Sequence, residues 1–177
     1  NLDGNSLSRV RNLPFNNDEY SVMHPTLTKD GSRLYFSSNM PDGLGGFDLY
    51  YVNIDEGGRY SAPVNLGPGV NTEGNEVFPF IFRDDVLFFA SNAHPGLGGL
   101  DVYMTVDLLT ENQQVLNMGS PFNTSSDDFC LYLDTQFKFG YISSNRKGGK
   151  GEDDIYSFKI DIPPPFGVDD YYTMARG

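Results

Sequence analysis

Carboxylate side chains near the starts of predicted strands are the residues of this sequence best suited to chemistry. Glu19, Glu76 and Asp128 lie at three such starts, and Asp127 lies beside the last. Carboxylate and carbonyl oxygens are the ligands that Ca²⁺ prefers, so these four residues are candidates for a cation site or for binding a polar partner. The sequence has no DxDxDG spacing of a calcium loop. We therefore expect no cofactor, with Ca²⁺ as the alternative.

A glycine-rich basic stretch, SSNRKGGKGEDDIY at residues 143–156, raises phosphate binding as a second chemistry. A P-loop needs Gly-x4-Gly-Lys-Ser/Thr at the start of a helix, whereas GGKGED leads into a predicted strand. Its backbone amides then lack the helix terminus that attracts anions. We interpret the stretch as a turn between two strands.

Catalytic signatures are few. The sequence has no GxSxG, HExxH or CxxC motif, two histidines (His24 and His94) and one cysteine, Cys130. His24 lies at a strand start and His94 in a loop, which favours ordinary structural roles. Cys130 lies in the apolar stretch FCLYL, so we expect a small buried side chain. No nucleophile is spaced with a base and an orienting third group, and we predict a non-enzymatic protein.

The glycine-rich stretch has two earlier copies, and this repetition favours architecture over catalysis. The copies are SSNMPDGLGGFDLY at residues 37–50 and ASNAHPGLGGLDVY at residues 90–103. Two polar positions recur 53 residues apart in all three: Asn39, Asn92 and Asn145, and Asp48, Asp101 and Asp154. A catalytic group is normally used once, whereas a fold element repeats. We predict that these six residues hold turns by hydrogen bonding within their own units.

Composition agrees with a single β-rich domain. The chain has 177 residues, of which 38% are hydrophobic and 14% aromatic, with 20 Gly and 11 Pro. Its net charge of −12 disfavours nucleic acid and anionic membranes as partners, because both attract positive surfaces. No apolar run approaches the roughly 18 to 20 residues that span a bilayer, so we expect no direct membrane insertion.

Strands must position these residues. Apolar runs at residues 33–38, 86–91 and 138–144 precede the repeated loops, and each is flanked by a further strand on either side. A weaker fourth strand is visible at residues 59–67 and 113–120, and residues 8–19 have the same form. We predict an all-β fold with three four-stranded propeller blades of about 53 residues each.

The predicted domain is a partial β-propeller over residues 1–162. Its blades cover about residues 20–66, 76–118 and 128–160, and an N-terminal strand covers residues 8–12. Residues 163–177 begin with three prolines and are expected to form a Pro-rich linker or tail. Three blades are too few for a ring, since propellers typically have about four to eight. The remaining blades are expected from the parent chain or from a second copy.

Three stretches carry a family resemblance: EYSVMHPTLTKDGSRLYFSSNMPDGLGGFDLYYV, NTEGNEVFPFIFRDDVLFFASNAHPGLGGLDVY and DDFCLYLDTQFKFGYISSNRKGGKGEDDIYSF. They resemble the TolB-type WD40-like repeats of OmpA-family, peptidoglycan-associated outer-membrane proteins, over about residues 8–160. The resemblance implies half of a six-bladed propeller in the periplasm, associated with the outer membrane of a Gram-negative bacterium. Some family members belong to the type IX secretion machinery. The tail does not resemble the β-sandwich that follows in the family, and these residues include no peptidoglycan-binding domain, so wall binding is not implied.

The expected function is a protein-interaction scaffold, with other proteins of an outer-membrane or secretion assembly as partners and no nucleic acid. One alternative is a propeller that binds glycan or peptidoglycan fragments through exposed tyrosines. Another is the substrate-gating propeller of a peptidase. In each case we expect Glu19, Glu76, Asp127 and Asp128 near the channel mouth, at an acidic end of the ring.

Overall fold

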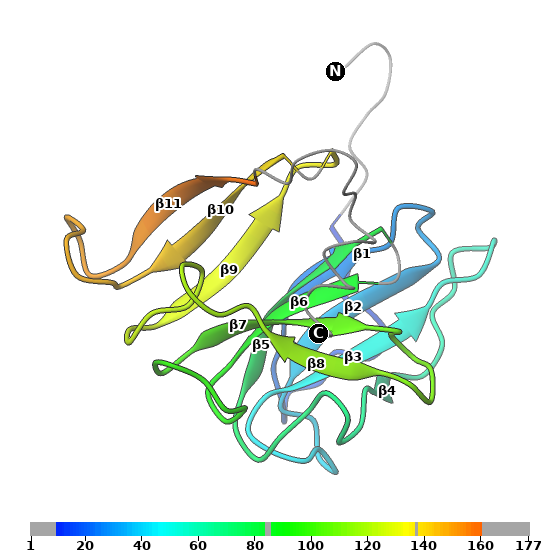
Figure 1. Ribbon diagram of the computed structural model, residues 1–177. Coiled ribbons are helices and arrows are strands. Elements are labelled where there is room, and N and C mark those ends of the chain that lie inside the picture. Colours follow the sequence, from blue (N-terminus) through cyan, green and yellow to red (C-terminus); the bar gives the residue numbers. More distant parts are fainter. Residues whose placement is uncertain (1–9, 84–85, 137, 161–177) are drawn as a thin grey trace.

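The computed structural model describes residues 10–83, 86–136 and 138–160, and every regular element within them is a β-strand (Figure 1). The first sheet contains β1 (Val22–Leu27), β2 (Arg33–Ser38), β3 (Asp48–Asn53) and β4 (Val64–Asn65). The second sheet contains β5 (Glu76–Phe82), β6 (Val86–Ser91), β7 (Asp101–Val106) and β8 (Gln114–Asn117). The third sheet contains β9 (Asp128–Leu133), β10 (Phe139–Ser144) and β11 (Asp154–Lys159). The all-β prediction is confirmed for these residues.

Each sheet is an antiparallel meander in which strands adjacent in sequence are paired. The predicted four strands are present in the first and second sheets, but the described part of the third sheet has three. The fourth strand of the first sheet is short, with two paired residues, Val64 and Asn65. Of the predicted N-terminal strand 8–12, residues 10–12 lie outside any strand. Residues 8 and 9 and the predicted tail 163–177 lie outside the described residues.

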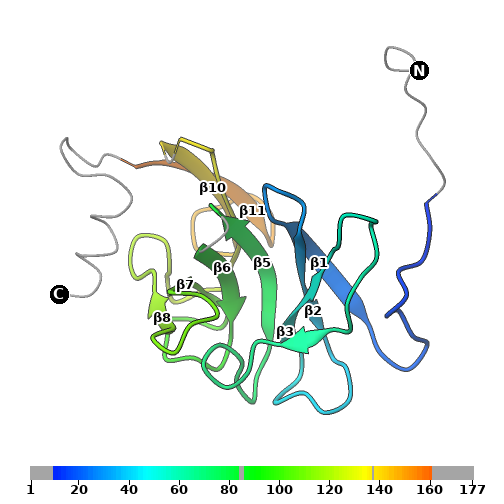
Figure 2. The same ribbon diagram turned by 90° about the vertical axis from the view of Figure 1, so that its right-hand side faces the viewer.

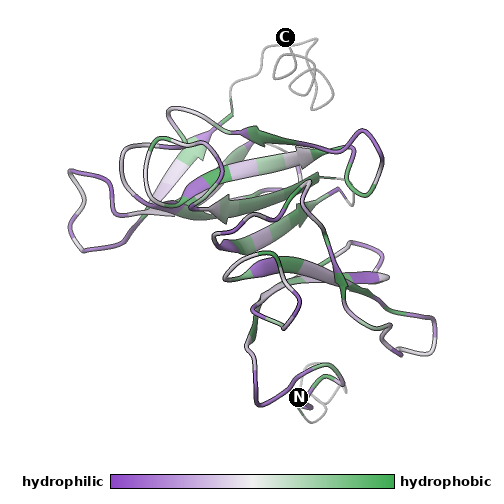
Figure 3. Ribbon diagram, turned by 90° about the horizontal axis from the view of Figure 1, so that it is seen from below, coloured by the Kyte–Doolittle hydropathy of each residue, from purple (hydrophilic) through white to green (hydrophobic). Residues whose placement is uncertain are grey.

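The sheets pack face to face in chain order, and the second sheet is covered on both sides (Figure 3). Phe89 and Tyr103 face the first sheet, where they meet Tyr35. Phe88 and Met104 face the third sheet. All residues of β6 and β7 are therefore buried, although their apolar residues are consecutive rather than alternating. Burying one such phenylalanine contributes about 1.5–3 kcal/mol.

The third sheet, in contrast, is covered by the described residues on one face only. Burial alternates along β10 and β11, because every second side chain points away from the second sheet. The uncovered face carries four exposed large side chains, Tyr132, Phe139, Tyr141 and Ile155, the last of them 76% exposed. At the opposite end of the row, residues 10–21 cover the outer face of the first sheet, with Phe15 stacked on Phe36.

The first strands of the sheets share a bulge. His24, Phe78 and Cys130 have left-handed backbone angles of 55°, 53° and 53°, and the strand register shifts at each of them. Neighbouring first strands also touch, since the ring of Phe78 stacks between the rings of His24 and Phe129. The bulge turns the side chain of Cys130 to the surface, so the prediction that it is buried was wrong.

One end of the molecule, which we call the loop end, combines two kinds of connection. The inner turns join the second and third strands of each sheet (residues 39–47, 92–100 and 145–153), and the linkers join consecutive sheets (residues 66–75 and 118–127). Each linker lies against the inner turn of the preceding sheet. The amides of Glu76 and Asp128 donate to the carbonyls of Phe47 and Leu100, both at 2.6 Å. A side chain on Gly98 would overlap the carbonyl oxygen of Ser126, so this contact requires glycine.

Candidate functional site

The repeated aspartates hold the inner turns at the loop end. Asp48, Asp101 and Asp154 each accept two backbone amides from the turn that precedes them. The donors are Leu44 and Gly45, Leu97 and Gly98, and Lys150 and Gly151, at 2.6 to 3.2 Å. The three aspartates thus occupy equivalent places in the three units and serve their own turns.

The repeated asparagines hold the starts of the first strands. The side-chain oxygens of Asn39, Asn92 and Asn145 each accept the backbone amide of the residue directly before the first strand of the same sheet. These amides belong to Ser21, Asn75 and Asp127, at 2.7, 2.9 and 2.8 Å. The side chain of Asp127 in turn accepts the amide of Leu100 in the preceding sheet and a hydrogen bond from Asn145. Asp127 therefore joins the second sheet to the third.

Glu76 and Asp128 occupy equivalent positions at the starts of β5 and β9, and both are 0% exposed. Glu76 accepts the amide of Thr72 at 2.8 Å and the hydroxyls of Thr72 and Ser91, both at 2.6 Å. Asp128 accepts the amide and hydroxyl of Thr124, the hydroxyl of Ser144 and the guanidinium of Arg146, the last at 2.7 Å. These carboxylates therefore stabilise the linkers from inside, away from solvent.

Glu19, the third predicted member of this set, lies elsewhere. It is exposed in a turn where its amide donates to Asn17, and the residue paired with Ser38 at the equivalent register is Val22. The side chains of Glu76, Asp127 and Asp128 accept hydrogen bonds from the linkers or the inner turns, whereas Glu19 is exposed to solvent. Within the described ranges, no three or more His, Cys, Asp or Glu side chains are grouped so that they could hold a metal ion.

Two buried asparagines that sequence reasoning missed fasten each linker to the third strand of the preceding sheet. Asn71 and Asn123, at 3% and 1% exposure, bond both backbone groups of Leu49 and Val102 respectively. Their amides also donate to Asn65 and Asn117 at 2.8 Å. The sequence marks both asparagines by similar motifs, PGVN at residues 68–71 and SPFN at residues 120–123. The same motif appears as LPFN in residues 13–16, but there Asn16 is exposed.

In the first two sheets the fourth strand places an asparagine opposite the tyrosine that lies two residues after the repeated aspartate: Asn65 is paired with Tyr50, and Asn117 with Tyr103. Burial raises the pKa of Tyr50, and a hydrogen bond with Asn65 acts in the opposite direction. Burial also raises the pKa of Tyr103, to about 12, again opposed by a hydrogen bond with Asn117. In the third sheet the matching hydroxyl, that of Tyr156, is buried without a hydrogen-bond partner in the described residues.

Both histidines have structural contacts. His24 Nδ1 accepts the amide of Phe78 at 3.3 Å, and burial lowers the pKa of His24. His94 Nε2 lies 2.8 Å from the carbonyl oxygen of Val70, so the protonated nitrogen donates to the linker. In the third sheet Lys147 stands at the position of His94, and its neighbour Arg146 makes the similar contact, donating to the carbonyl of Phe122 at 2.7 Å. Cys130 is exposed, and the partial burial of its thiol raises its pKa.

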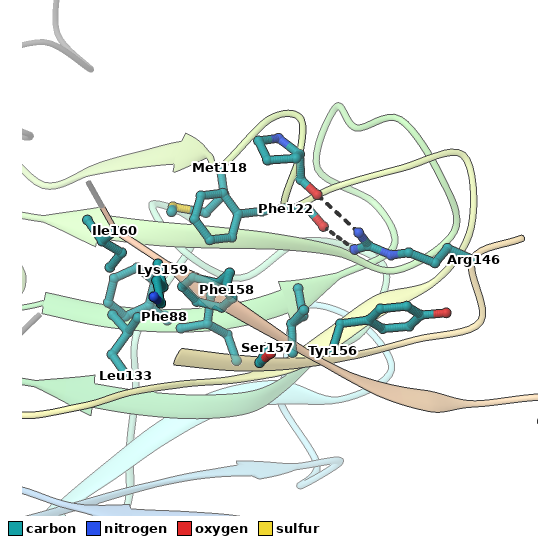
Figure 4. Close-up of a pocket in the computed structure, with 13 residues that line it drawn as sticks. Phe88, Met118, Phe122, Leu133, Arg146, Tyr156, Ser157, Phe158, Lys159 and Ile160 are labelled. Atoms are coloured by element: carbon teal, nitrogen blue, oxygen red, sulfur yellow. Dashed lines mark hydrogen bonds between the residues drawn. The ribbon is translucent and has the colours of Figure 1, made fainter. Parts of the chain in front are cut away.

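An apolar pocket of about 450 Å³ opens between the second and third sheets (Figure 4). Phe158 and Ile160 line one side, and Met118 and Phe122 line the other. Arg146 lies at the rim, where its guanidinium stacks on the ring of Tyr156. The pocket adjoins β11, the strand that has no fourth strand beside it in the described part of the third sheet.

The surface of the loop end combines apolar tips with charge. Leu44 and Leu97 stand at the same position of the first two inner turns and are 46% and 56% exposed. Asp42 is exposed two residues before Leu44, and Glu73 is exposed in the linker that lies against the same turn at Gly45. The third inner turn has Lys150 in place of these leucines. Within the described residues, no helix is long and apolar enough to cross a membrane.

Comparison with known proteins finds a likeness of fold. No protein-family model matches the chain, and no curated protein matches it. Among solved structures it is similar to prolyl oligopeptidase B from Galerina marginata bound to a 35mer hydrolysis and macrocyclization substrate, with a TM-score of 0.53 and 15% identity over 80% of this chain and 18% of that chain. A second structure of that enzyme, bound to a 25mer macrocyclization substrate, matches with a TM-score of 0.53 and 15% identity over 81% of this chain and 19% of that chain.

This chain therefore spans less than a fifth of the length of the enzymes that it matches. At 15% identity the likeness concerns the fold alone. Together with the three antiparallel sheets packed in a row, it is consistent with consecutive blades of a β-propeller. The described residues do not form a closed ring by themselves.

Proposed function

We propose that this chain is a non-catalytic interaction module, three consecutive blades of a WD40-like β-propeller that holds partner proteins. The observation that carries the proposal is that the buried polar residues of the loop end serve the fold, while its exposed residues are free to contact a partner. Glu76 and Asp128, which could have bound a ligand, have their oxygens engaged inside the linkers. The exposed groups at the same end are leucine tips and carboxylates, which suit contact with another protein.

The partner-binding surface is formed by the first two inner turns and the linker between them. Leu44 and Leu97 supply apolar contacts, and Asp42 and Glu73 supply negative charge beside them. With a net charge of −12, the chain attracts partners that carry a positive rim around an apolar centre. Charge at the rim guides the encounter, and the leucines are desolvated when the complex forms.

The family resemblance of the repeats supports the cellular setting of this proposal. The resemblance implies a propeller of an OmpA-family protein in the periplasm, at the outer membrane, with partners in an outer-membrane or secretion assembly such as the type IX machinery. The remaining blades of a six-bladed ring come from the parent chain or from a second copy. The uncovered face of the third sheet supports this arrangement, because the same face of the other sheets is covered by a neighbour.

A glycan-binding propeller is the second candidate, and one observation favours it. Tyr132 and Tyr141 are 52% and 44% exposed, and exposed tyrosine rings can stack on sugars. A peptidase-gating propeller has the support of fold likeness to prolyl oligopeptidase B, which carries no inference about substrate at 15% identity.

Photo-crosslinking in the native cell envelope tests the proposal. A benzophenone amino acid is placed at Leu97, on the loop end, and in a matched control at Leu109, which is 40% exposed in the turn between β7 and β8. We expect a defined protein adduct from position 97 and none of that mass from position 109. Equal adducts from both positions, or glycan adducts alone, would contradict a protein-binding loop end.

A further inference from the structure

The third sheet lacks its outermost strand in the described residues, while a segment at the other end of the row resembles such a strand. In the second sheet this strand contributes Val115, Asn117 and the adjoining Met118. Val10, Asn12 and Leu13 repeat that pattern, valine-x-asparagine followed by an apolar residue. In the structure Val10 is 102% exposed, Asn12 is exposed, and neither lies in a strand.

We propose that residues 10–21 of a second copy of this chain, which we call the donor segment, bind along β11 and its inner turn, with Val10 in the apolar pocket and Asn12 at the hydroxyl of Tyr156. The donor segment and the acceptor strand lie at opposite ends of the row of sheets (Figure 2). One copy therefore cannot fill its own site without unfolding, and the contact is head to tail.

The pocket fits the valine because the sheet before it shows the same contact filled. Val115 of β8 packs into the core between the first and second sheets. The equivalent position one sheet further on is the space between the second and third sheets, which is the pocket of about 450 Å³ lined by Phe158, Ile160 and Leu133. An extended segment added to β11 brings Val10 to this space by β-augmentation.

The hydroxyl of Tyr156 supplies a polar contact that is independent of the pocket. It is buried without a hydrogen-bond partner in the described residues, which is uncommon for a buried polar group. In the first two sheets the matching tyrosines, Tyr50 and Tyr103, stand opposite Asn65 and Asn117 in the strand pairing. The hydroxyl of Tyr103 donates to the carbonyl oxygens of His94 and Pro95 at 2.9 and 3.1 Å, and the amide of Asn117 donates to the same Pro95 carbonyl at 3.2 Å. Asn12 is the residue of the donor segment that stands at the place of these asparagines.

The donor segment also carries a counterpart of the linker asparagines Asn71 and Asn123, at a shorter spacing: these follow the fourth-strand asparagines Asn65 and Asn117 by six residues, whereas Asn16 follows Asn12 by four. Asn71 and Asn123 bond the backbone of Leu49 and Val102, whereas the corresponding Asn16 is exposed. The residue of β11 that follows the repeated aspartate, as Leu49 and Val102 do, is Ile155, which is 76% exposed. Asn16 of the second copy would complete the third such contact.

The residue sizes in the inner turn of the third sheet are complementary to those in the donor segment of a second copy. Side chains on Gly46 and Gly99 would overlap the side-chain oxygens of Asn75 and Asp127 in the following linker. The third turn has Glu152 at this position, and the residue that stands at the place of Asn75 in the donor segment is the smaller Ser21. A larger residue in the turn thus faces a smaller one in the segment.

Charge and a retained glycine agree with this fit. Lys150 replaces the leucine of the other turns, and Asp18 and Glu19 lie in the donor segment where the linkers contact those turns. Gly151 stands where Gly98 must accommodate the following linker, yet a side chain on Gly151 would come no closer than 3.3 Å to any described residue other than its two chain neighbours. A second copy gives this glycine a contact to accommodate.

Light scattering on the chain of residues 1–177 tests the proposal. At about 100 µM we expect a mass twice 19.7 kDa. Val10→Asp should give a folded monomer, because Val10 makes no contact in a single copy. Leu109→Asp, the same change at an exposed site outside the contact, should leave the dimer intact.

Two further variants separate strand addition from unspecific association. Tyr156→Phe, which removes a hydroxyl that is unpaired in one copy, should weaken association by roughly tenfold, the effect of one hydrogen bond of about 1.4 kcal/mol. Lys150→Glu should weaken it, and Lys150→Glu combined with Glu19→Lys should restore it. A monomeric parent chain, or a dimer that Val10→Asp leaves unchanged, would overturn the proposal. Neither result alters the crosslinking test of the loop end.

Discussion

Replacing Glu76 by alanine removes a buried carboxylate that three groups contact. The amide of Thr72 and the hydroxyls of Thr72 and Ser91 lose their acceptor, and the site is 0% exposed, so water does not replace it without rearrangement. A hydrogen bond to a charged group contributes about 1.5–3 kcal/mol, and the three bonds of one side chain are not additive. We expect Glu76→Ala to lower the free energy of unfolding by about 3–4 kcal/mol.

Thermal and urea unfolding measure this effect. For a chain of this size 1 kcal/mol corresponds to roughly 2–4 °C, so the melting temperature should fall by about 10 °C. Glu19→Ala is the matched control, since Glu19 is exposed, and it should change stability by less than about 0.5 kcal/mol. If Glu76→Ala kept the parent melting temperature but lost binding of Ca²⁺ or of a protein partner, Glu76 would be a ligand-binding residue and our interpretation would be refuted.

Three other predictions use the repeat as an internal control, each in the Val10→Asp background so that association does not contribute. Asn123→Ala should lower stability by about 1–3 kcal/mol in urea unfolding and Asn16→Ala by less than about 0.5, because the first is buried with its bonds made and the second is exposed. Gly98→Ala should destabilise the chain by forcing the linker away from the turn, whereas Gly151→Ala should not, and equal effects would contradict the packing at Ser126. Burial lowers the pKa of His24, so below pH 6.5 the unfolded chain binds a proton that the native chain does not bind. The contribution of His24 to stability should therefore be full above pH 6.5 and should be lost as the pH falls through the native pKa. Unfolding measured against pH should show a smaller loss in His24→Asn.

The repeat could be predicted from sequence because the turns it specifies are local. Asp101 bonds amides three and four residues before it, so spacing alone indicates its role. Asn71 bonds Leu49, which lies 22 residues away, and that contact depends on how the linker crosses the third strand. The similar linker motifs indicate that Asn71 and Asn123 are equivalent, but they do not indicate which backbone groups these asparagines bond.

Glu19 shows why matching residue type is weaker than matching register. It was grouped with Glu76 and Asp128 as an acidic residue before a first strand, yet the strand pairing puts Val22 at their position. Cys130 was misjudged for a related reason. Its apolar neighbours predict burial, but a bulge with a left-handed backbone angle reverses the face on which it points. Bulges depend on the tertiary packing of the first strands, which periodicity does not report.

The central claim is that the polar residues of the loop end fasten each unit to the next. Residue-resolved amide hydrogen exchange tests it most directly at Glu76 and Asp128, whose amides donate across the sheet boundaries to Phe47 and Leu100 at 2.6 Å. We predict that both amides exchange only through global unfolding, while the amide of Glu19 in its exposed turn exchanges fast. Exchange at Glu76 and Asp128 as fast as at Glu19 would contradict the claim.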